Sequence, residues 1–273
     1  MSDEDFSTIR TYRNEADDRL LHIDLDRPEE NNVVNTELLR ELGDAIRAGD
    51  AHEGVDAIIL GTTGENFCAG GSLQELGSID RDAGNRFLTA YIDTVELLRE
   101  TGKPTVAAVK GTCVAGGNEI VMSADIIVGG ESARFGQPEA AVGSTAAGGG
   151  VQMMPLIVGE QRAKDLMLTA RLLSAEEAED WGLINRVVPD DEVDERATEI
   201  AQTIIDENSP QAYRVIKAML KQWSNVAMVN REVARELTAN VWGSEEFRDR
   251  ANSFMDGEKL EPRSFPGTLA DED

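Results

Sequence analysis

The stretch from Lys103 to Glu139, KPTVAAVKGTCVAGGNEIVMSADIIVGGESARFGQPE, decides the fold that we expect for this chain. Its runs PTVAAV and ADIIV are short and mostly apolar, without the alternation of a half-exposed strand, which is typical of strands buried on both faces. A glycine turn and a short apolar helix around Asn118 to Ser123 connect them. The stretch therefore predicts parallel strands joined through helices.

The sequence on the N-terminal side continues this alternation of strands and helices. Two runs with strand-like alternation come first, and NEADD between them is typical of a turn within a strand pair. Apolar residues then recur at helical spacing, with Thr36 as the expected N-cap and Gly49 as the expected end of the helix. The expected elements are strands at residues 7–15, 19–28 and 56–64 and helices at residues 36–49 and 82–100.

The C-terminal side is mainly helical. The sequence SAEE at Ser174–Glu177 fits a capping box before a helix, and Pro210 stands in the first turn of an amphipathic segment at residues 209–223. From about Asp190 onward, amphipathic helices dominate. We therefore expect an α/β protein with a core at residues 1–190, a helical region at residues 191–265 and a disordered tail at residues 266–273.

The composition is strongly acidic. Asp and Glu number 52 against 26 Lys and Arg, which gives a formal net charge of −26. Such a charge argues against nucleic-acid binding, which needs a basic surface. An acid-rich and lysine-poor exterior favours a protein from a halophile, because carboxylates hold water and cations while salt screens their mutual repulsion. An ordinary acidic cytosolic protein is the alternative.

Other compositional features exclude further classes of protein. No apolar run reaches the roughly 20 residues that span a bilayer, and the acidic start MSDEDFSTIR lacks the features of a signal peptide, so we expect a cytoplasmic protein without a membrane partner. Cys68 and Cys113 lie far apart in the sequence and indicate neither a disulfide framework nor a zinc site. His22 and His52 lie near no motif that presents a nucleophile, and we interpret them as surface or strand polar residues.

Two glycine turns follow buried strands, CAGG at residues 68–71 and VAGG at residues 114–117. They lack the lysine of a phosphate-binding P-loop and the spacing of a dinucleotide fingerprint. Glycine permits positive φ angles and close approach of the backbone, so two such turns on neighbouring strands can aim two N–H groups at one oxygen, as in an oxyanion hole. The alternative is that the glycines only allow tight packing of strand against helix.

Four runs of sequence together resemble the enoyl-CoA hydratase/isomerase family, the crotonases. They are FCAGGSLQEL, the opening stretch extended to AAVG, LTARLLSAEEAEDWGLINRVVP and, more loosely, LDRPEENNVVN. The resemblance covers about residues 20–190. It implies a crotonase-type spiral of β-β-α units with a C-terminal helical region that builds a homotrimer, often paired into a hexamer. The implied ligand is an acyl thioester of coenzyme A, which is part of the substrate, so no separate cofactor and no metal is implied.

The resemblance also assigns roles to single residues. In the family pattern F-x-A-G-x-D-L, the residue after the glycine supplies one oxyanion amide, here Gly71, and Gly116 of AGGNE supplies the second. Glu119 matches the first catalytic glutamate of the hydratases, and Glu139, in FGQPE, matches the second. The residues implied to contact the thioester or coenzyme A are Glu29, Asn31, Ala69, Ser72, Gly117 and Ser144.

Two glutamates kept together favour the addition of water to an α,β-unsaturated thioester. This reaction needs a base that takes a proton from water and an acid that delivers a proton to Cα. Burial beside a like charge raises a carboxyl pKa, so one carboxyl group can be protonated at neutral pH while the other is ionised. The alternative for either glutamate is a solvated surface position, the commonest one for Glu.

The chain departs from the family pattern at several positions. Ser72 replaces the usual aspartate after A-G-x, Gln74 replaces the common lysine, and Ala115 replaces the third glycine of the usual G-G-G. The sequence FMDGEKL replaces the usual basic signature near the C-terminus. The phosphates of coenzyme A are therefore left to Lys259, Arg27 or an arginine of a neighbouring subunit.

The segment VGSTAAGGGVQ, together with GGNEI before it, resembles hydratases that act on cyclic dienoyl-CoA thioesters. Ser144 also matches dihydroxynaphthoyl-CoA synthase, but the aspartate of that enzyme is replaced here by Ala146, which argues against the synthase. The leading prediction is an enoyl-CoA hydratase. The alternatives are a cyclic dienoyl-CoA hydratase, an enoyl-CoA isomerase that uses one glutamate, and a family member that binds acyl-CoA as a scaffold without turnover.

Overall fold

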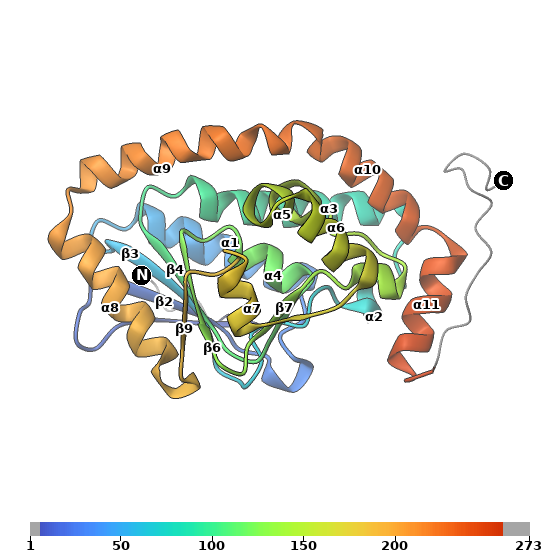
Figure 1. The fold of residues 1–273 in the computed structure, drawn as a ribbon, viewed down its shortest axis with the longest axis horizontal. Helices are drawn as coiled ribbons and strands as arrows, with labels where there is room; N and C mark the ends of the chain where they lie inside the picture. The colour runs from blue at the N-terminus through green and yellow to red at the C-terminus, as the bar shows by residue number, and fades with distance from the viewer. Residues whose placement is uncertain (1–5, 259–273) are drawn as a thin grey trace.

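Two β-sheets and a surrounding layer of helices form the fold in the computed structural model, which describes residues 6–258 (Figure 1). The larger sheet has the order β1-β2-β3-β4-β6-β9, with bounds Ile9–Arg13, Leu20–Leu25, Ala57–Thr62, Thr105–Val109, Ile126–Gly130 and Arg186–Val188. The smaller sheet has the order β5-β7-β8, with bounds Thr112–Val114, Arg134–Gly136 and Leu173–Ser174. The α/β class predicted from the sequence is therefore confirmed.

The helices follow the strands in the expected alternation and then dominate the C-terminal part. Their bounds are α1 Thr36–Ala51, α2 Leu73–Leu76, α3 Arg81–Glu100, α4 Gly116–Val121, α5 Gly150–Val158, α6 Glu160–Thr169, α7 Ala175–Asp180, α8 Val193–Glu207, α9 Pro210–Asn225, α10 Arg231–Trp242 and α11 Glu245–Met255. No helix within residues 6–258 is long and apolar enough to cross a membrane.

The pairing of the larger sheet explains its sequence pattern. β1 pairs with β2 in antiparallel fashion, with Ile9 opposite Leu25, and every later pair from β2 to β9 is parallel. Parallel strands need long connections, which the helices supply. The predicted parallel arrangement and the predicted N-terminal strand pair are both confirmed.

The larger sheet is buried on both faces. Leu21 and Ile23 of β2 belong to the large core that includes buried residues of α1 and α3. Leu20 lies in a second, smaller core with buried residues of α8, among them Ala197 and Ala201. Successive residues of a strand point to opposite faces, so burial of both faces explains why the strands are apolar throughout.

The first helix departs from the sequence prediction at both ends. The N-cap is Asn35 and not Thr36, because the Asn35 backbone is extended and its side chain accepts a hydrogen bond from Leu38 N at 2.8 Å. The helix also continues past Gly49 to Ala51. Gly49 is a packing residue, since a Cβ there would lie 2.6 Å from Leu21 Cδ2 of the neighbouring strand.

The helix starts predicted at Ser174 and Pro210 are confirmed, but the capping box is only half formed, because the Glu177 carboxylate accepts hydrogen bonds from Arg171. The Ser174 side chain caps α7 by accepting a hydrogen bond from Glu177 N at 3.2 Å, and Pro210 occupies the first turn of α9. Helices α9 and α10 then run along one long side of the molecule (Figure 1). The boundary at residue 190 stays a prediction, and the predicted tail at residues 266–273 lies outside the described residues, as does Lys259.

Candidate active site

Two glycine turns come together because the segments before them pair. Cys68 N donates to Thr112 O at 2.9 Å and Val114 N donates to Cys68 O at 3.0 Å, which forms a parallel bridge between Cys68 and Cys113. Both cysteines are buried and unlinked. Each segment then turns at its glycines, and a Cβ at Gly70, whose φ is +96°, would lie 2.7 Å from the Ala115 Cβ. The two turns are therefore in contact.

The contact leaves two backbone N–H groups available for a ligand. Within residues 6–258, no acceptor is found for the N–H of Gly71 or of Gly116, and both residues line the same cavity. Gly116 is also the first residue of α4, where N–H groups have no partner inside the helix. Gly117 differs, since its Cβ would lie 2.6 Å from the Cys68 Cβ. Gly71 and Gly116 thus leave their N–H groups free for a ligand, while Gly117 allows the two turns to pack closely.

Ala115 holds a strained backbone conformation just before Gly116. Its φ of +49° and ψ of −126° lie in a region that residues with a side chain rarely adopt. Strain of this kind persists only where the surroundings impose it, and it concentrates at functional sites. With its amide nitrogen facing the site, Gln137 donates to Ala115 O at 3.2 Å and so helps to hold this turn.

The cavity beside these turns has a volume of about 760 Å³ and mostly apolar walls. The residues predicted for the site that line it are Asn31, Ala69, Gly71, Ser72, Gly116, Glu119, Glu139 and Ser144. Glu29 and Gly117 do not line it. Glu30 lines it in place of Glu29, and the chain after it turns at Asn31 and Asn32, which both adopt left-handed backbone conformations.

Glu119 is buried in the wall of this cavity, in the first turn of α4. Its Oε1 accepts a hydrogen bond from Gly150 N, the first N–H of α5, at 2.7 Å. Burial raises the pKa of Glu119 to about 7, although the N–H of Gly150 and the hydroxyl of Tyr91 favour the ionised form and limit the rise. Glu119 is therefore poised to titrate near neutral pH.

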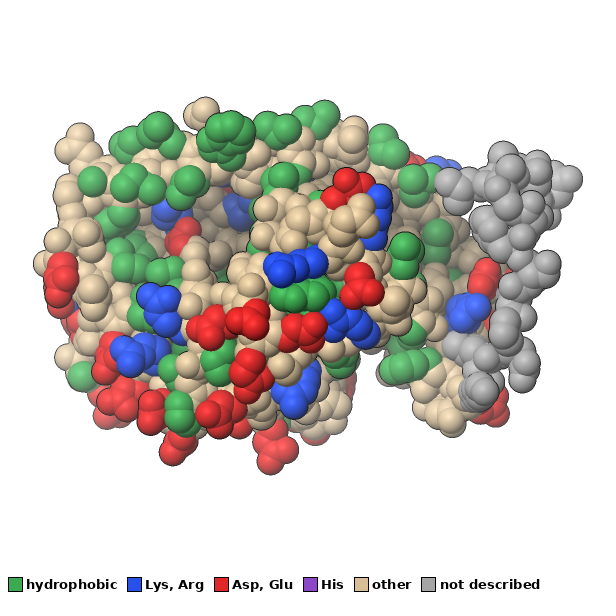
Figure 2. Space-filling view, in the orientation of Figure 1, with side chains coloured by type: hydrophobic (Ala, Val, Ile, Leu, Met, Phe, Trp, Pro, Cys, Tyr) green, Lys and Arg blue, Asp and Glu red, His purple; other side chains and the backbone are tan. Residues whose placement is uncertain are grey.

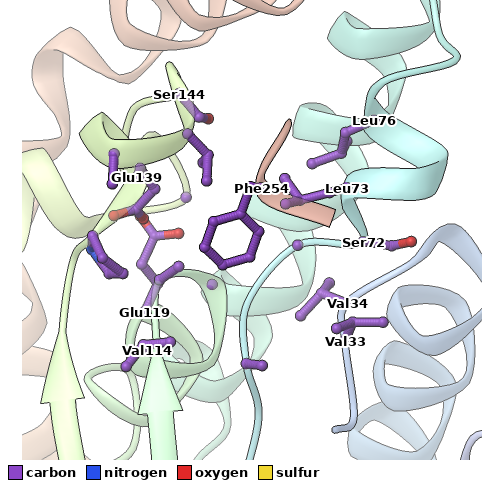
Figure 3. Close-up of a pocket in the computed structure, with 18 of the residues that line it drawn as sticks. Val33, Val34, Ser72, Leu73, Leu76, Val114, Glu119, Glu139, Ser144 and Phe254 are labelled. Carbon is purple, nitrogen blue, oxygen red and sulfur yellow. The ribbon is translucent and has the colours of Figure 1, made fainter. Parts of the chain in front are cut away.

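Glu139 begins the 3₁₀ turn Glu139–Val142, and its carboxyl group faces that of Glu119 (Figure 3). Burial, followed by the charge of Glu119, raises the pKa of Glu139 well above its ordinary value. Gln137, oriented as above, donates to Glu139 Oε1 at 2.8 Å. At neutral pH the pair therefore favours a protonated Glu139 beside an ionisable Glu119. Two facing carboxyl groups in different protonation states can act as acid and base.

These features coincide with a match to known proteins. A sequence model of the enoyl-CoA hydratase/isomerase family matches residues 15–263. The chain belongs to this family. It is 33% identical over 247 residues to a probable enoyl-CoA hydratase of Rhizobium meliloti, covering 90% of this chain and 95% of the relative. It is 32% identical over 253 residues to a mevalonyl-coenzyme A hydratase of Aspergillus fumigatus, covering 92% of this chain and 93% of the relative.

The fold agrees with solved structures of the enoyl-CoA hydratase/isomerase family. An enoyl-CoA hydratase/isomerase from Xanthobacter autotrophicus Py2 superposes with a TM-score of 0.83 at 30% identity, covering 92% of this chain and 94% of that chain. The crotonase-type fold that the sequence predicted is therefore confirmed.

For this family member, the sequence motifs miss several residues of the cavity wall. Tyr91 comes from α3, Trp242 from α10, and Phe254 from α11. The Trp242 Nε1 donates to the Ser144 Oγ at 2.7 Å, and the Phe254 ring extends into the cavity (Figure 3). Apolar spacing in the sequence marks these helix faces as inward but does not separate a core from a cavity.

The described part of this family member contains no group of three or more His, Cys, Asp and Glu side chains that could hold a metal ion. Of the basic residues proposed for the phosphates of coenzyme A, Arg27 forms an ion pair with Glu30 at the edge of the cavity.

Proposed function

We propose that this protein is an enoyl-CoA hydratase that adds water across the α,β double bond of an enoyl-CoA thioester. The observation that carries the proposal is the pair of facing carboxyl groups, Glu119 and Glu139, in the wall of a cavity that also receives the unpaired N–H groups of Gly71 and Gly116. Acid, base and oxyanion donors are the parts that this reaction requires.

In this proposal the N–H groups of Gly71 and Gly116 bind the thioester oxygen. Ionised Glu119 takes a proton from a water molecule while the water oxygen bonds to Cβ. The electrons of the double bond move toward the thioester, whose oxygen becomes an enolate oxygen held by the two N–H groups. Protonated Glu139 then delivers its proton to Cα. One amide of this kind is worth about 3 kcal/mol of the barrier.

The assignment of base and acid follows from the surroundings of each carboxyl group. Glu119 receives the Gly150 N–H at the start of α5, where the helix dipole also favours an anion. Glu139 instead feels the negative charge of Glu119, which favours its protonated form. The lower pKa of Glu119 suits a base, and the higher pKa of Glu139 suits an acid.

A cyclic dienoyl-CoA thioester is the second candidate substrate. The supporting observation is that Ser144, from the segment VGSTAAGGGVQ, lines the cavity with a hydroxyl oriented by Trp242. An isomerase that uses one glutamate is the third candidate, but two facing carboxyl groups favour hydration over isomerisation.

We also propose that the protein assembles as a trimer, alone or paired into a hexamer. Large hydrophobic side chains are exposed along α9, the turn Ala227–Asn230 and α10, including Val215, Met219, Trp223, Val229, Val233 and Leu237. Figure 2 shows hydrophobic side chains gathered along the upper edge of the molecule, where Figure 1 places α9 and α10. A contiguous apolar surface of this kind marks a protein interface. The assembly is proposed for the cytoplasm of a halophile, as the acidic composition suggests.

The test follows the loss of conjugated-enoyl absorbance from crotonyl-CoA in concentrated potassium chloride. Wild type is compared with Glu119→Gln and Glu139→Gln, which keep the shape of each side chain. We expect either variant to turn over substrate at least about a hundredfold more slowly, with little change in acyl-CoA binding. Equal rates in all three proteins would refute the two-glutamate mechanism, and acyl-CoA binding without turnover in all three would favour the scaffold. Turnover of a cyclic dienoyl-CoA without turnover of crotonyl-CoA would identify the substrate as a cyclic thioester.

A further inference from the structure

Tyr91 reaches both functional parts of the cavity from α3. Its ring is stacked against Phe87 one turn earlier in the helix, and the residue is only 4% exposed. Its hydroxyl donates to Gly116 O at 2.5 Å, in the turn that presents the Gly116 N–H. A Tyr hydroxyl buried in an apolar wall normally has a hydrogen-bond partner, but this partner belongs to the candidate oxyanion turn.

The ring of Tyr91 is fixed in place by a glycine of the segment that also holds Glu119. A Cβ at Gly148 would lie 1.6 Å from Tyr91 Cε1 and 2.7 Å from Glu119 Oε2. The Tyr91 ring and the Glu119 carboxylate therefore both pack against the Cα of Gly148. Any residue larger than glycine at position 148 would displace one of them.

The Tyr91 hydroxyl also lies near the Glu119 carboxylate, since the ring and the carboxylate contact the same glycine, and its influence lowers the pKa of Glu119. Burial, together with the charge of Glu119, raises the pKa of Tyr91 well above its ordinary value, so the hydroxyl keeps its proton. A phenolic hydroxyl has one proton to donate. The Gly116 carbonyl oxygen and the Glu119 carboxylate are thus two acceptors for a single donor.

We propose that Tyr91 is a positioning residue that shares its proton between the Gly116 carbonyl oxygen and the Glu119 carboxylate, and so couples the oxyanion turn to the base. The proposal rests on the proposed hydratase function. While Glu119 is ionised, Tyr91 donates to it and stabilises the charge. Once Glu119 has accepted a proton from water, the Tyr91 hydroxyl donates to Gly116 and steadies the turn that holds the enolate. Tyr91 gains and loses no proton at any step.

The kinetic test uses Tyr91→Phe, which keeps the ring and removes only the hydroxyl. Because a hydrogen bond to a charged group favours the ionised form, its loss raises the pKa of the base. We expect kcat to fall about tenfold with KM little changed, and the acidic limb of the pH-rate profile to move up by about one pH unit. The control is Tyr213→Phe, which removes a hydroxyl from α9, outside the cavity. Wild-type kcat and an unshifted acidic limb in Tyr91→Phe would overturn the proposal.

A second measurement needs no turnover. The change in melting temperature caused by Tyr91→Phe is measured at about pH 5.5 and about pH 8, in wild type and in Glu119→Gln. We expect a larger loss of stability at the higher pH in wild type, where Glu119 is ionised, and no such pH dependence in Glu119→Gln. The same loss at both pH values in both backgrounds would overturn the coupling. An inactive wild type that still shows the pH-dependent coupling would refute the hydratase but keep the link between Tyr91 and Glu119.

Discussion

The Gly150 N–H donates to Glu119 Oε1 at 2.7 Å, which ties the more acidic of the two facing carboxyl groups to the glycine run Gly148–Gly150. Two of these glycines, Gly148 and Gly150, have little space for a side chain. A Cβ at Gly150 would lie 3.0 Å from Glu119 Oε1 and 2.6 Å from the Ala146 Cβ. Gly148 and Gly150 are therefore required by contact with the carboxylate and its neighbours, whereas Gly149 is required by its φ of +139°.

We predict that Gly148→Ala removes activity and destabilises the fold, because the new Cβ would overlap the Tyr91 ring at 1.6 Å. Overpacking of a buried site costs about 1 to 3 kcal/mol. The matched control is Gly182→Ala, whose Cβ meets nothing within 4 Å and which loses only the freedom needed for a φ of +76°. Melting temperatures and hydration rates check the prediction. Full activity in Gly148→Ala would show that Tyr91 can move without consequence.

We predict a bell-shaped pH dependence of kcat/KM. The acidic limb should lie near pH 7, because Glu119 must be ionised and its pKa is about 7. The basic limb should lie at higher pH, because Glu139 must be protonated and its pKa is raised further. Initial rates across a pH series at constant ionic strength measure both limbs. A flat profile from acid to base would contradict the assignment of the two carboxyl groups.

We predict that Ala115→Gly stabilises the protein, because glycine adopts a φ of +49° and a ψ of −126° without the strain of a Cβ. The expected gain is about 1 kcal/mol, since strain of about 1 to 3 kcal/mol is relieved at an entropic cost of about 0.5 to 1 kcal/mol. The control Ala170→Gly relieves a milder left-handed conformation, with a φ of +53°. Chemical denaturation measures both, and an equal gain in the two variants would show that Ala115 is not specially strained.

The glycine turns and both glutamates could be predicted from the sequence because their signals are local. The carboxyl groups of Glu119 and Glu139 stand out inside apolar runs and the glycines mark two tight turns, while the roles predicted for Gly71 and Gly116 follow from the family resemblance. The N-cap at Asn35 could not be predicted, because Asn and Thr are both good N-caps. The choice between Asn35 and Thr36 depends on which of the two residues has an extended backbone.

The single residues of the rest of the cavity could not be predicted, because the cavity is made by contacts between distant segments. Tyr91, Trp242 and Phe254 come from three helices, and their spacing looks like that of an ordinary buried face. The three-residue strands Thr112–Val114 and Arg134–Gly136 are too short to show a period. No pattern in the sequence indicates that the Cys68 segment pairs with the Cys113 segment.

We predict that the assembly depends on salt and on the apolar surface of α9 and α10. Low salt should dissociate it, because a formal charge of −26 per chain is then poorly screened. Trp223→Glu should dissociate it even in concentrated salt, because Trp223 is 78% exposed in a single chain and would meet a partner there. Light scattering across a salt series measures both. The control is Leu168→Glu, at a position of α6 that is 79% exposed, and an oligomer unaffected by Trp223→Glu would place the interface elsewhere.

We predict that Glu119→Gln stabilises the protein in a pH-dependent way. The folded-state pKa of about 7 lies above the ordinary value, so the wild-type fold loses stability as pH rises from about 4.5 to about 7, by on the order of 2 to 3 kcal/mol. Gln carries no charge and avoids this loss. The gain should therefore be larger at about pH 8 than at about pH 5.5 in thermal unfolding.

Glu41→Gln is the matched control for this prediction, because the Glu41 side chain is also buried but its pKa is shifted in the opposite direction. Burial alone would raise its pKa, but hydrogen bonds from Thr8 and Ser7 outweigh burial and hold the pKa below its ordinary value. Ionised Glu41 therefore stabilises the fold, and this stability is lost only as the pH falls below the ordinary pKa of a glutamate. Glu41→Gln should therefore destabilise by a similar amount at about pH 5.5 and about pH 8. A gain for Glu119→Gln that did not grow with pH, against this constant loss, would mean that Glu119 is already ionised at the lower pH and that its pKa is not raised to about 7.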